Sequence, residues 1–106
     1  MATITPTAAV AAGSSVGFAP ASAGGDSVVV GSNAVTFLVR NAGGASINVT
    51  FAGAIQCSQG STHNTVVACP VGDTKIRIPA QAVNADTGLA AVTYSATASI
   101  TVAATV

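Results

Sequence analysis

The sequence predicts an all-β fold, namely an antiparallel β-sandwich of about seven strands, immunoglobulin-like or jelly-roll-like, with an extended N-terminal arm. Ala, Val, Thr, Gly and Ser supply 72 of the 106 residues, and Glu, a good helix former, is absent. The β-branched members of this set fit a pleated, half-buried surface. Short runs that alternate apolar and polar residues recur about every ten residues between turn signals, which is typical of antiparallel sheets.

The chain divides into two segments by composition. Residues 1–25 contain mainly Ala, Thr, Ser, Pro and Gly, so we expect an extended N-terminal arm that gains order only against a neighbouring molecule. Residues 26–106 carry the alternating runs and are expected to form the β-sandwich domain. A chain of 106 residues has room for one such core.

The first three predicted strands lie close together in the sequence. Residues 27–30 form an apolar run that the turn at 31–33 ends, and residues 34–40 alternate along a second run. The Asn-Ala-Gly-Gly turn at 41–44 leads into a third run at 46–51. One face of the second and third runs is apolar throughout: Val35, Phe37, Val39, Ile47, Val49 and Phe51. Two such runs joined by a Gly-Gly turn predict a β-hairpin.

Four further runs complete the predicted strands: residues 65–69, 74–78, 90–95 and 99–103. A proline follows each of the first two runs, and proline ends a strand because it cannot donate to the hydrogen-bond ladder of a sheet. The intervening segments 52–63 and 80–88 contain polar residues and glycine, and they are predicted to be loops.

Charge is scarce, with three basic and three acidic residues and a formal net charge of zero. A net charge near zero promotes association, so we expect partners to cover much of the surface. The alternative is a soluble monomer with a surface of Thr, Ser and Asn. Lys75 and Arg77 alternate with the inward Ile76 and Ile78, which places both cations on the outer face of one strand. They either form a solvated face or pair with an acidic partner surface.

Nucleic acid and membranes are not expected as partners. Three basic residues are too few for a phosphate-binding surface or a polybasic membrane patch, and no run of about 20 apolar residues could span a bilayer. The sequence Ala-Ser-Ala at 21–23 could mimic a signal-peptidase site, but no basic residue precedes it, and Pro6 and Gly13 interrupt the apolar region. We therefore expect synthesis in the cytoplasm, after which the protein stays there or joins an assembly.

Cys57, His63 and Cys69 are the residues that could hold a metal ion. They offer three ligands without a fourth, whereas structural zinc prefers four, so no metal or other cofactor is predicted and His63 is expected in a surface loop. Cys57 and Cys69 could form a disulfide in an oxidising environment or remain buried thiols in a reducing one. Both alternatives stay open.

No catalytic residue is predicted, and we do not expect an enzyme. A triad needs a nucleophile, a base and an orienting acid, but the single His63 lies in a polar loop and no Gly-x-Ser-x-Gly motif occurs. Asp26, Asp73 and Asp86 lie beside glycine or in turns, where aspartate favours local hydrogen bonds. Tyr94 is expected either to anchor an interface or to pack into the core with its hydroxyl at the edge.

The order of features after residue 34 resembles a known family. Residues 37–50 read as strand, small-residue turn and strand, followed by Ile-Arg-Ile-Pro-Ala at 76–80 and two closing runs at 92–95 and 99–104. This pattern resembles the small β-sandwich virion structural proteins of tailed actinobacterial bacteriophages. The resemblance implies a capsid decoration, or cement, protein that forms trimers on the outer surface of the head and bridges major capsid subunits. It also implies synthesis in the host cytoplasm and assembly onto the virion.

Two other functions remain open at this point. A tail or head-tail connector subunit of the same kind of virus would share these features, with ring-shaped rather than trimeric assembly. A carbohydrate-binding or adhesin-like β-sandwich would need exposed aromatic side chains for sugar stacking. The four aromatic residues are Phe18, Phe37, Phe51 and Tyr94, and two of them are expected in the core.

Overall fold

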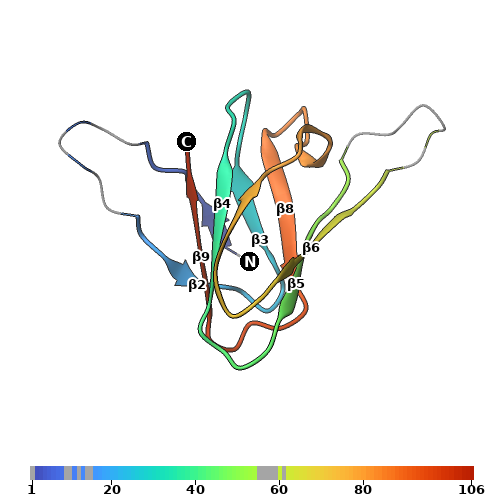
Figure 1. The fold of residues 1–106 in the computed structure, drawn as a ribbon. Coiled ribbons are helices and arrows are strands. Elements are labelled where there is room, and N and C mark those ends of the chain that lie inside the picture. The colour runs from blue at the N-terminus through green and yellow to red at the C-terminus, as the bar shows by residue number, and fades with distance from the viewer. Residues whose placement is uncertain (1, 9–10, 12, 14–15, 55–59, 61) are drawn as a thin grey trace.

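The computed structural model describes residues 2–8, 11, 13, 16–54, 60 and 62–106 of the chain. Within these residues, nine strands and one short 3-10 helix form two sheets that pack face to face (Figure 1). The elements in chain order are β1 (Ala2–Ile4), β2 (Ala19–Pro20), β3 (Asp26–Val29), β4 (Thr36–Asn41), β5 (Ile47–Phe51), β6 (Thr65–Cys69), β7 (Gly72–Arg77), η1 (Ala80–Ala82), β8 (Leu89–Tyr94) and β9 (Ile100–Thr105). The prediction of an all-β sandwich is confirmed. No helix among the described residues is long and apolar enough to cross a membrane.

The two sheets have the strand orders β1-β3-β8-β5-β6 and β2-β9-β4-β7, which we call the five-stranded and the four-stranded sheet. The pairs between named strands are antiparallel except β1 with β3, which is parallel. The seven predicted strands correspond to β3 through β9. The alternation of apolar and polar residues predicts these strands because one side of each sheet faces the core and the other faces outward.

The core lies between the sheets and takes its two largest side chains from opposite sides. Phe37 of β4 and Phe51 of β5 are both fully buried, and their rings meet edge to face at 5.6 Å between centroids and 85° between planes. Valine and isoleucine side chains from both sheets surround this pair. The edge-to-face contact adds to the hydrophobic stabilisation that burial of each ring supplies.

The predicted hairpin between β4 and β5 is wrong. β4 pairs with β7 and β9, whereas β5 pairs with β6 and β8, so the two strands lie in different sheets. The apolar faces of the two strands face each other across the core instead of lying side by side in one sheet. The Gly-Gly segment between them is therefore a crossover from one sheet to the other, which lies at the lower end of the molecule in Figure 1.

Asn41 organises this crossover. Its side chain is 2% exposed, and its amide nitrogen Nδ2 donates to the carbonyl oxygens of Ala45 at 2.8 Å and Cys69 at 3.2 Å. Its Oδ1 accepts a hydrogen bond from the backbone N–H of Gly43 at 3.0 Å. The crossover also contacts the turn before β9, where the N–H of Ala42 donates to the carbonyl of Ser99. One buried amide thus ties both sheets to the connecting segment.

The segment predicted as an N-terminal arm contributes to the edges of both sheets. β1 lies beside β3 in the five-stranded sheet, and β2 lies beside β9 in the four-stranded sheet. Between them, Thr7 pairs with Thr105 beyond β2 on the same edge of β9. β1, Thr7 and β2 therefore lie against the edges of the sandwich. Their gain of order on assembly stays a prediction.

Gly25 is the residue immediately before β3. Its φ of +94° lies in the left-handed region, and a Cβ atom there would approach the carbonyl oxygen of Val92 to 2.7 Å. A side chain would both strain the backbone and clash with β8. Glycine is therefore required where the chain turns into β3 along the surface of β8.

Candidate functional site

Of the three residues singled out for metal or disulfide chemistry, His63 and Cys69 lie within the described structure. Cys57 lies outside the described residues, His63 is exposed in the loop before β6, and Cys69 is a buried free thiol in β6. Burial raises the pKa of the Cys69 thiol, and a hydrogen bond with Thr74 opposes that rise. Among the described residues, no three His, Cys, Asp or Glu side chains lie close enough to hold a metal ion.

Asp26 occupies a different environment from the turn that was expected. It is the first residue of β3 and only 1% exposed. The hydroxyl of Tyr94 donates to its Oδ2 at 2.6 Å, and the N–H of Ser22 donates to the same oxygen at 3.3 Å. Tyr94 packs against the core with its hydroxyl directed to this carboxylate. Of its two expected roles, this is the one in which the ring packs into the core and the hydroxyl lies at the edge. The carboxylate thus links the segment before β3 to β8.

The contact with Asp26 makes the ionisation of Tyr94 a probe of the fold. Burial raises the pKa of Tyr94 far above its ordinary value of about 10, and the hydrogen bond and the negative charge of Asp26 raise it further. A raised pKa in the folded state contributes stability that is complete below the unfolded pKa and is lost as pH rises above it. We therefore expect stability to fall above about pH 10, with tyrosinate appearing as the protein unfolds.

The measurement is a combined alkaline titration of tyrosinate absorbance and circular dichroism, which is clean because Tyr94 is the single tyrosine. The Asp26→Asn variant removes the negative charge, so we expect its tyrosine to ionise at lower pH than that of the wild type. Ionisation of wild-type Tyr94 near pH 10 with an unchanged native dichroism spectrum would contradict this role of the contact.

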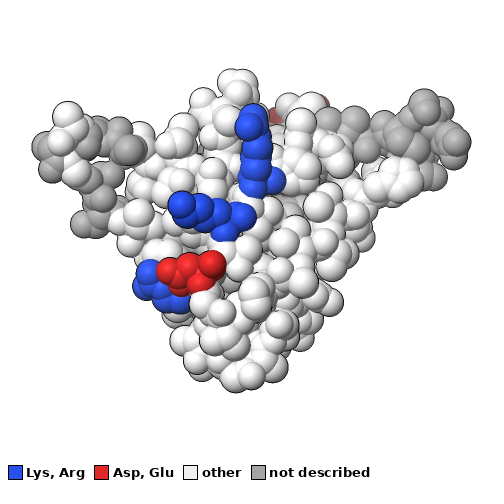
Figure 2. All heavy atoms as spheres, viewed as in Figure 1, with Lys and Arg blue, Asp and Glu red and all other residues white. Residues whose placement is uncertain are grey.

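The three basic residues and Asp73 lie on the outer face of the four-stranded sheet. Arg40 of β4 and Asp73 of β7 are cross-strand partners, and Nε of Arg40 lies 3.1 Å from Oδ1 of Asp73. The guanidinium carbon of Arg40 lies 4.1 Å from the centre of the Phe18 ring, a cation–π contact. The exposed side chains of Lys75 and Arg77 follow on β7, as their alternation predicted. Figure 2 shows these charges grouped on the face toward the viewer.

An apolar groove of about 390 Å³ lies beside the Arg40–Asp73 ion pair, and we call it the β4–β7 groove. The segment before β2 and strands β4 and β7 line it through Val16, Phe18, Leu38, Val39, Arg40, Asp73, Thr74 and Lys75. Val16 is 41% exposed, so an apolar side chain lies open to solvent on this wall. The groove combines apolar walls with cations, which suits a protein ligand better than a small sugar.

The outer face of the five-stranded sheet differs from that of the four-stranded sheet in charge. Its side chains are small or β-branched and uncharged on the described strands: Ser27, Val29, Asn48, Thr50, Val66, Ala68, Ala91 and Thr93. One of the two edge strands of this sheet, β6, has no charged residue, and its Val66 is 59% exposed. Exposed sheet edges without charge readily pair with another chain.

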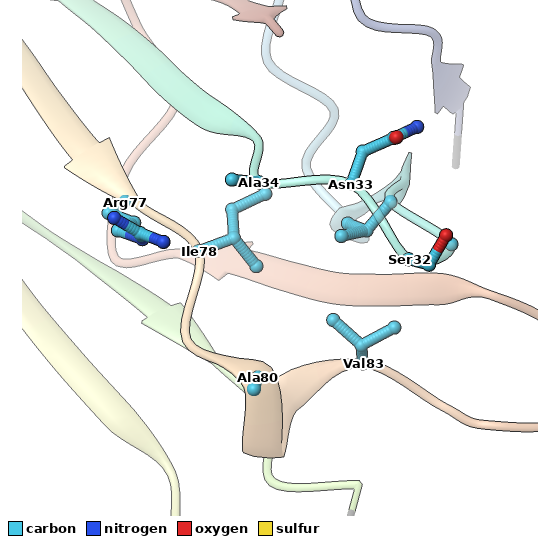
Figure 3. Close-up of a pocket in the computed structure, with 9 residues that line it drawn as sticks. Ser32, Asn33, Ala34, Arg77, Ile78, Ala80 and Val83 are labelled. Atoms are coloured by element: carbon cyan, nitrogen blue, oxygen red, sulfur yellow. The ribbon is translucent and has the colours of Figure 1, made fainter.

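A second pocket of about 330 Å³ lies between the turn after β3 and the segment that follows β7 (Figure 3). Ile78 and Val83 point into it, whereas the polar ends of Ser32 and Asn33 point away. Arg77 lines one side of the pocket. Ligand sites normally combine an apolar pocket with a few converging polar groups, and this pocket does not show that convergence.

Comparison with protein-family models, curated proteins and solved structures finds no match for this chain. Sequence reasoning missed the contact of Phe18 with Arg40 and the pairing of Arg40 with Asp73. The opposite charges of Arg40 and Asp73 are a signal for their pairing. That signal can be used only when the register of β4 with β7 is known.

Proposed function

We propose that this chain is a phage virion structural protein, namely a capsid decoration protein on the outer surface of the head. In this role it binds major capsid subunits, bridges them and stabilises the shell. The observation that carries the proposal is the division of the sandwich surface into one face with the cations and one face without charge. The resemblance of residues 34–106 to small virion proteins of tailed actinobacterial phages supports the same role.

Two unlike faces suit a protein that makes two kinds of contact. A decoration protein must bind the shell and also pack against its own copies, and these surfaces have different compositions. The uncharged face and the β6 edge offer small and β-branched side chains that can pack closely between copies, which supports a homo-oligomer and, under the resemblance, a trimer. The proposal includes neither nucleic acid nor membrane as a partner, and no enzymatic activity.

The placement of the aromatic side chains argues against the carbohydrate-binding alternative. Phe37 and Phe51 are buried in the core, the hydroxyl of Tyr94 is bound to Asp26, and one face of Phe18 is occupied by Arg40. A sugar platform normally presents the open face of an aromatic ring. A tail or connector subunit would share all these features, and location in the particle distinguishes it.

The direct test is to purify particles of the phage that carries this gene and to measure the protein by quantitative mass spectrometry. We expect it in purified heads, in a fixed ratio to the major capsid subunit. Heads from a phage with the gene deleted are expected to lose DNA at lower temperature than wild-type heads. Recovery of the protein only in tails would favour the connector or tail alternative, and its absence from particles would refute the proposal.

A further inference from the structure

We propose that the outer face of β4 and β7, with the β4–β7 groove, is the surface that docks on a carboxylate-bearing protein. This inference rests on the proposed function, since the protein in question would be the outer surface of the major capsid subunits. The β4–β7 face would then be the side of the sandwich that meets the shell, and the shell would present carboxylates to it. The uncharged face is then left for contacts between copies.

The charges within the chain leave Lys75 and Arg77 without a carboxylate of their own. The chain has three acidic residues, Asp26, Asp73 and Asp86. Asp73 pairs with Arg40, and Asp26 is buried beside Tyr94. Asp86 lies in the loop between η1 and β8. Among the described residues, the Arg40–Asp73 pair is the ion pair found, so the face carries two cations that a partner could neutralise.

A second copy of the chain is a poor source of the missing carboxylates. It would bring the same three acidic residues, of which Asp26 is buried and Asp73 is already paired, so that Asp86 is left as a single exposed carboxylate for two cations. A symmetric contact through this face would also bring like charges together, which costs free energy. The face therefore suits a different protein, and a carboxylate is the group that best matches the guanidinium of Arg77, because two parallel hydrogen bonds can form.

The apolar part of the face argues for a protein and against a polyanion. Val16, Phe18 and Leu38 line the groove beside the cations, and the contacts with Phe18 and Asp73 hold the Arg40 side chain in place. Protein interfaces typically combine an apolar centre with a charged rim. Binding to nucleic acid or to an anionic lipid surface instead needs many basic residues, and this face has three.

The test uses undecorated heads, purified from particles grown without this gene, as the probe. Binding of purified wild-type protein and of the double variant Lys75→Gln with Arg77→Gln is measured by cosedimentation over a range of salt concentrations. The matched control is Ser46→Glu with Gln81→Glu, which makes the same change in net charge at exposed positions away from both sheet faces. We expect the cation variant to bind about tenfold or more weakly, the control to bind normally, and wild-type affinity to fall with salt.

Each outcome of this experiment decides a separate question. Wild-type binding that the Lys75 and Arg77 substitutions leave unchanged would overturn the docking face and leave the decoration role standing. Failure of the wild type to bind any head would overturn the decoration role and the docking face with it. Binding of the wild type to DNA or to vesicles with phosphatidylserine, lost in the cation variant, would replace the protein partner by a polyanion. Matching thermal unfolding of all three proteins confirms that folding is not the cause.

Discussion

Replacing Phe51 with alanine is expected to destabilise the fold by about 3–5 kcal/mol, a large part of the stability of a domain of this size. Phe51 is fully buried and meets Phe37 from the opposite sheet, so its removal opens a cavity between the sheets and ends the aromatic contact. The core around it consists mainly of β-branched side chains, which can adjust little. The measurement is urea unfolding followed by far-ultraviolet circular dichroism, read as a lower midpoint.

The matched control for this substitution is Thr50→Ala, the neighbouring position on β5. Thr50 faces outward on the five-stranded sheet, and we expect its removal to change the unfolding free energy by no more than about 0.5 kcal/mol. A loss below about 1.5 kcal/mol for Phe51→Ala, or a similar loss for both variants, would contradict the packing of β4 against β5 across the core.

Replacing Asn41 with alanine is expected to cost about 2–4 kcal/mol, although Asn41 was expected to be an ordinary turn residue. The substitution removes three hydrogen bonds and leaves the carbonyls of Ala45 and Cys69 and the N–H of Gly43 without this partner. Unmatched buried backbone groups lose the full free energy of their hydration. Urea unfolding measures the loss, and hydrogen exchange of the Gly43 amide should accelerate.

Asn48→Ala provides the comparison for Asn41, because it removes the same side chain from an exposed position of β5. We expect Asn48→Ala to change stability by less than about 0.5 kcal/mol. Equal effects of the two substitutions would show that the buried amide does not organise the crossover between the sheets.

The strands could be predicted from the sequence because the two faces of each sheet differ. Phe37 and Val39 point inward on β4 and Ile76 points inward on β7, as the period of two requires. Val35, just before β4, and Ile78, just after β7, are buried in the same phase. The sheet to which a strand belongs could not be predicted in this way. A strand with one apolar face satisfies its burial equally well beside its sequence neighbour or opposite it, so the alternation left the β4–β5 relationship undetermined. The hydrogen bond from the buried Asn41 side chain to the carbonyl of Cys69 links β4 to β6 in the other sheet. These two residues are far apart in the sequence, so local patterns do not reveal the contact.

The N-terminal strands escaped prediction for another reason. β1 and β2 have three and two residues, which is too short for an alternation to be visible. Their position depends on hydrogen bonds to the edges of β3 and β9, and those edges exist only after the sandwich forms. Asp26 was misplaced for a related reason, because its partner Tyr94 is separated from it by 68 residues.

The candidate interaction surface was predictable in part. The alternation of β7 placed Lys75 and Arg77 on one outer face, and the structure confirms that placement. The addition of Arg40 to this face follows from the antiparallel register in which Arg40 lies opposite Asp73. The groove additionally requires the segment at Val16 and Phe18 to lie beside β4 and β7, which local sequence patterns do not specify.

The most direct test of the decoration role is cryo-electron microscopy of particles purified from the source of this gene, beside particles with the gene deleted. The account predicts density for this two-sheet sandwich on the outer head surface of wild-type particles only, with the β4–β7 face toward the capsid subunits (Figure 2). The symmetry of that density gives the number of copies in each oligomer. Identical outer surfaces in the two kinds of head would contradict the decoration role, and a sandwich whose uncharged face meets the shell would contradict the docking face.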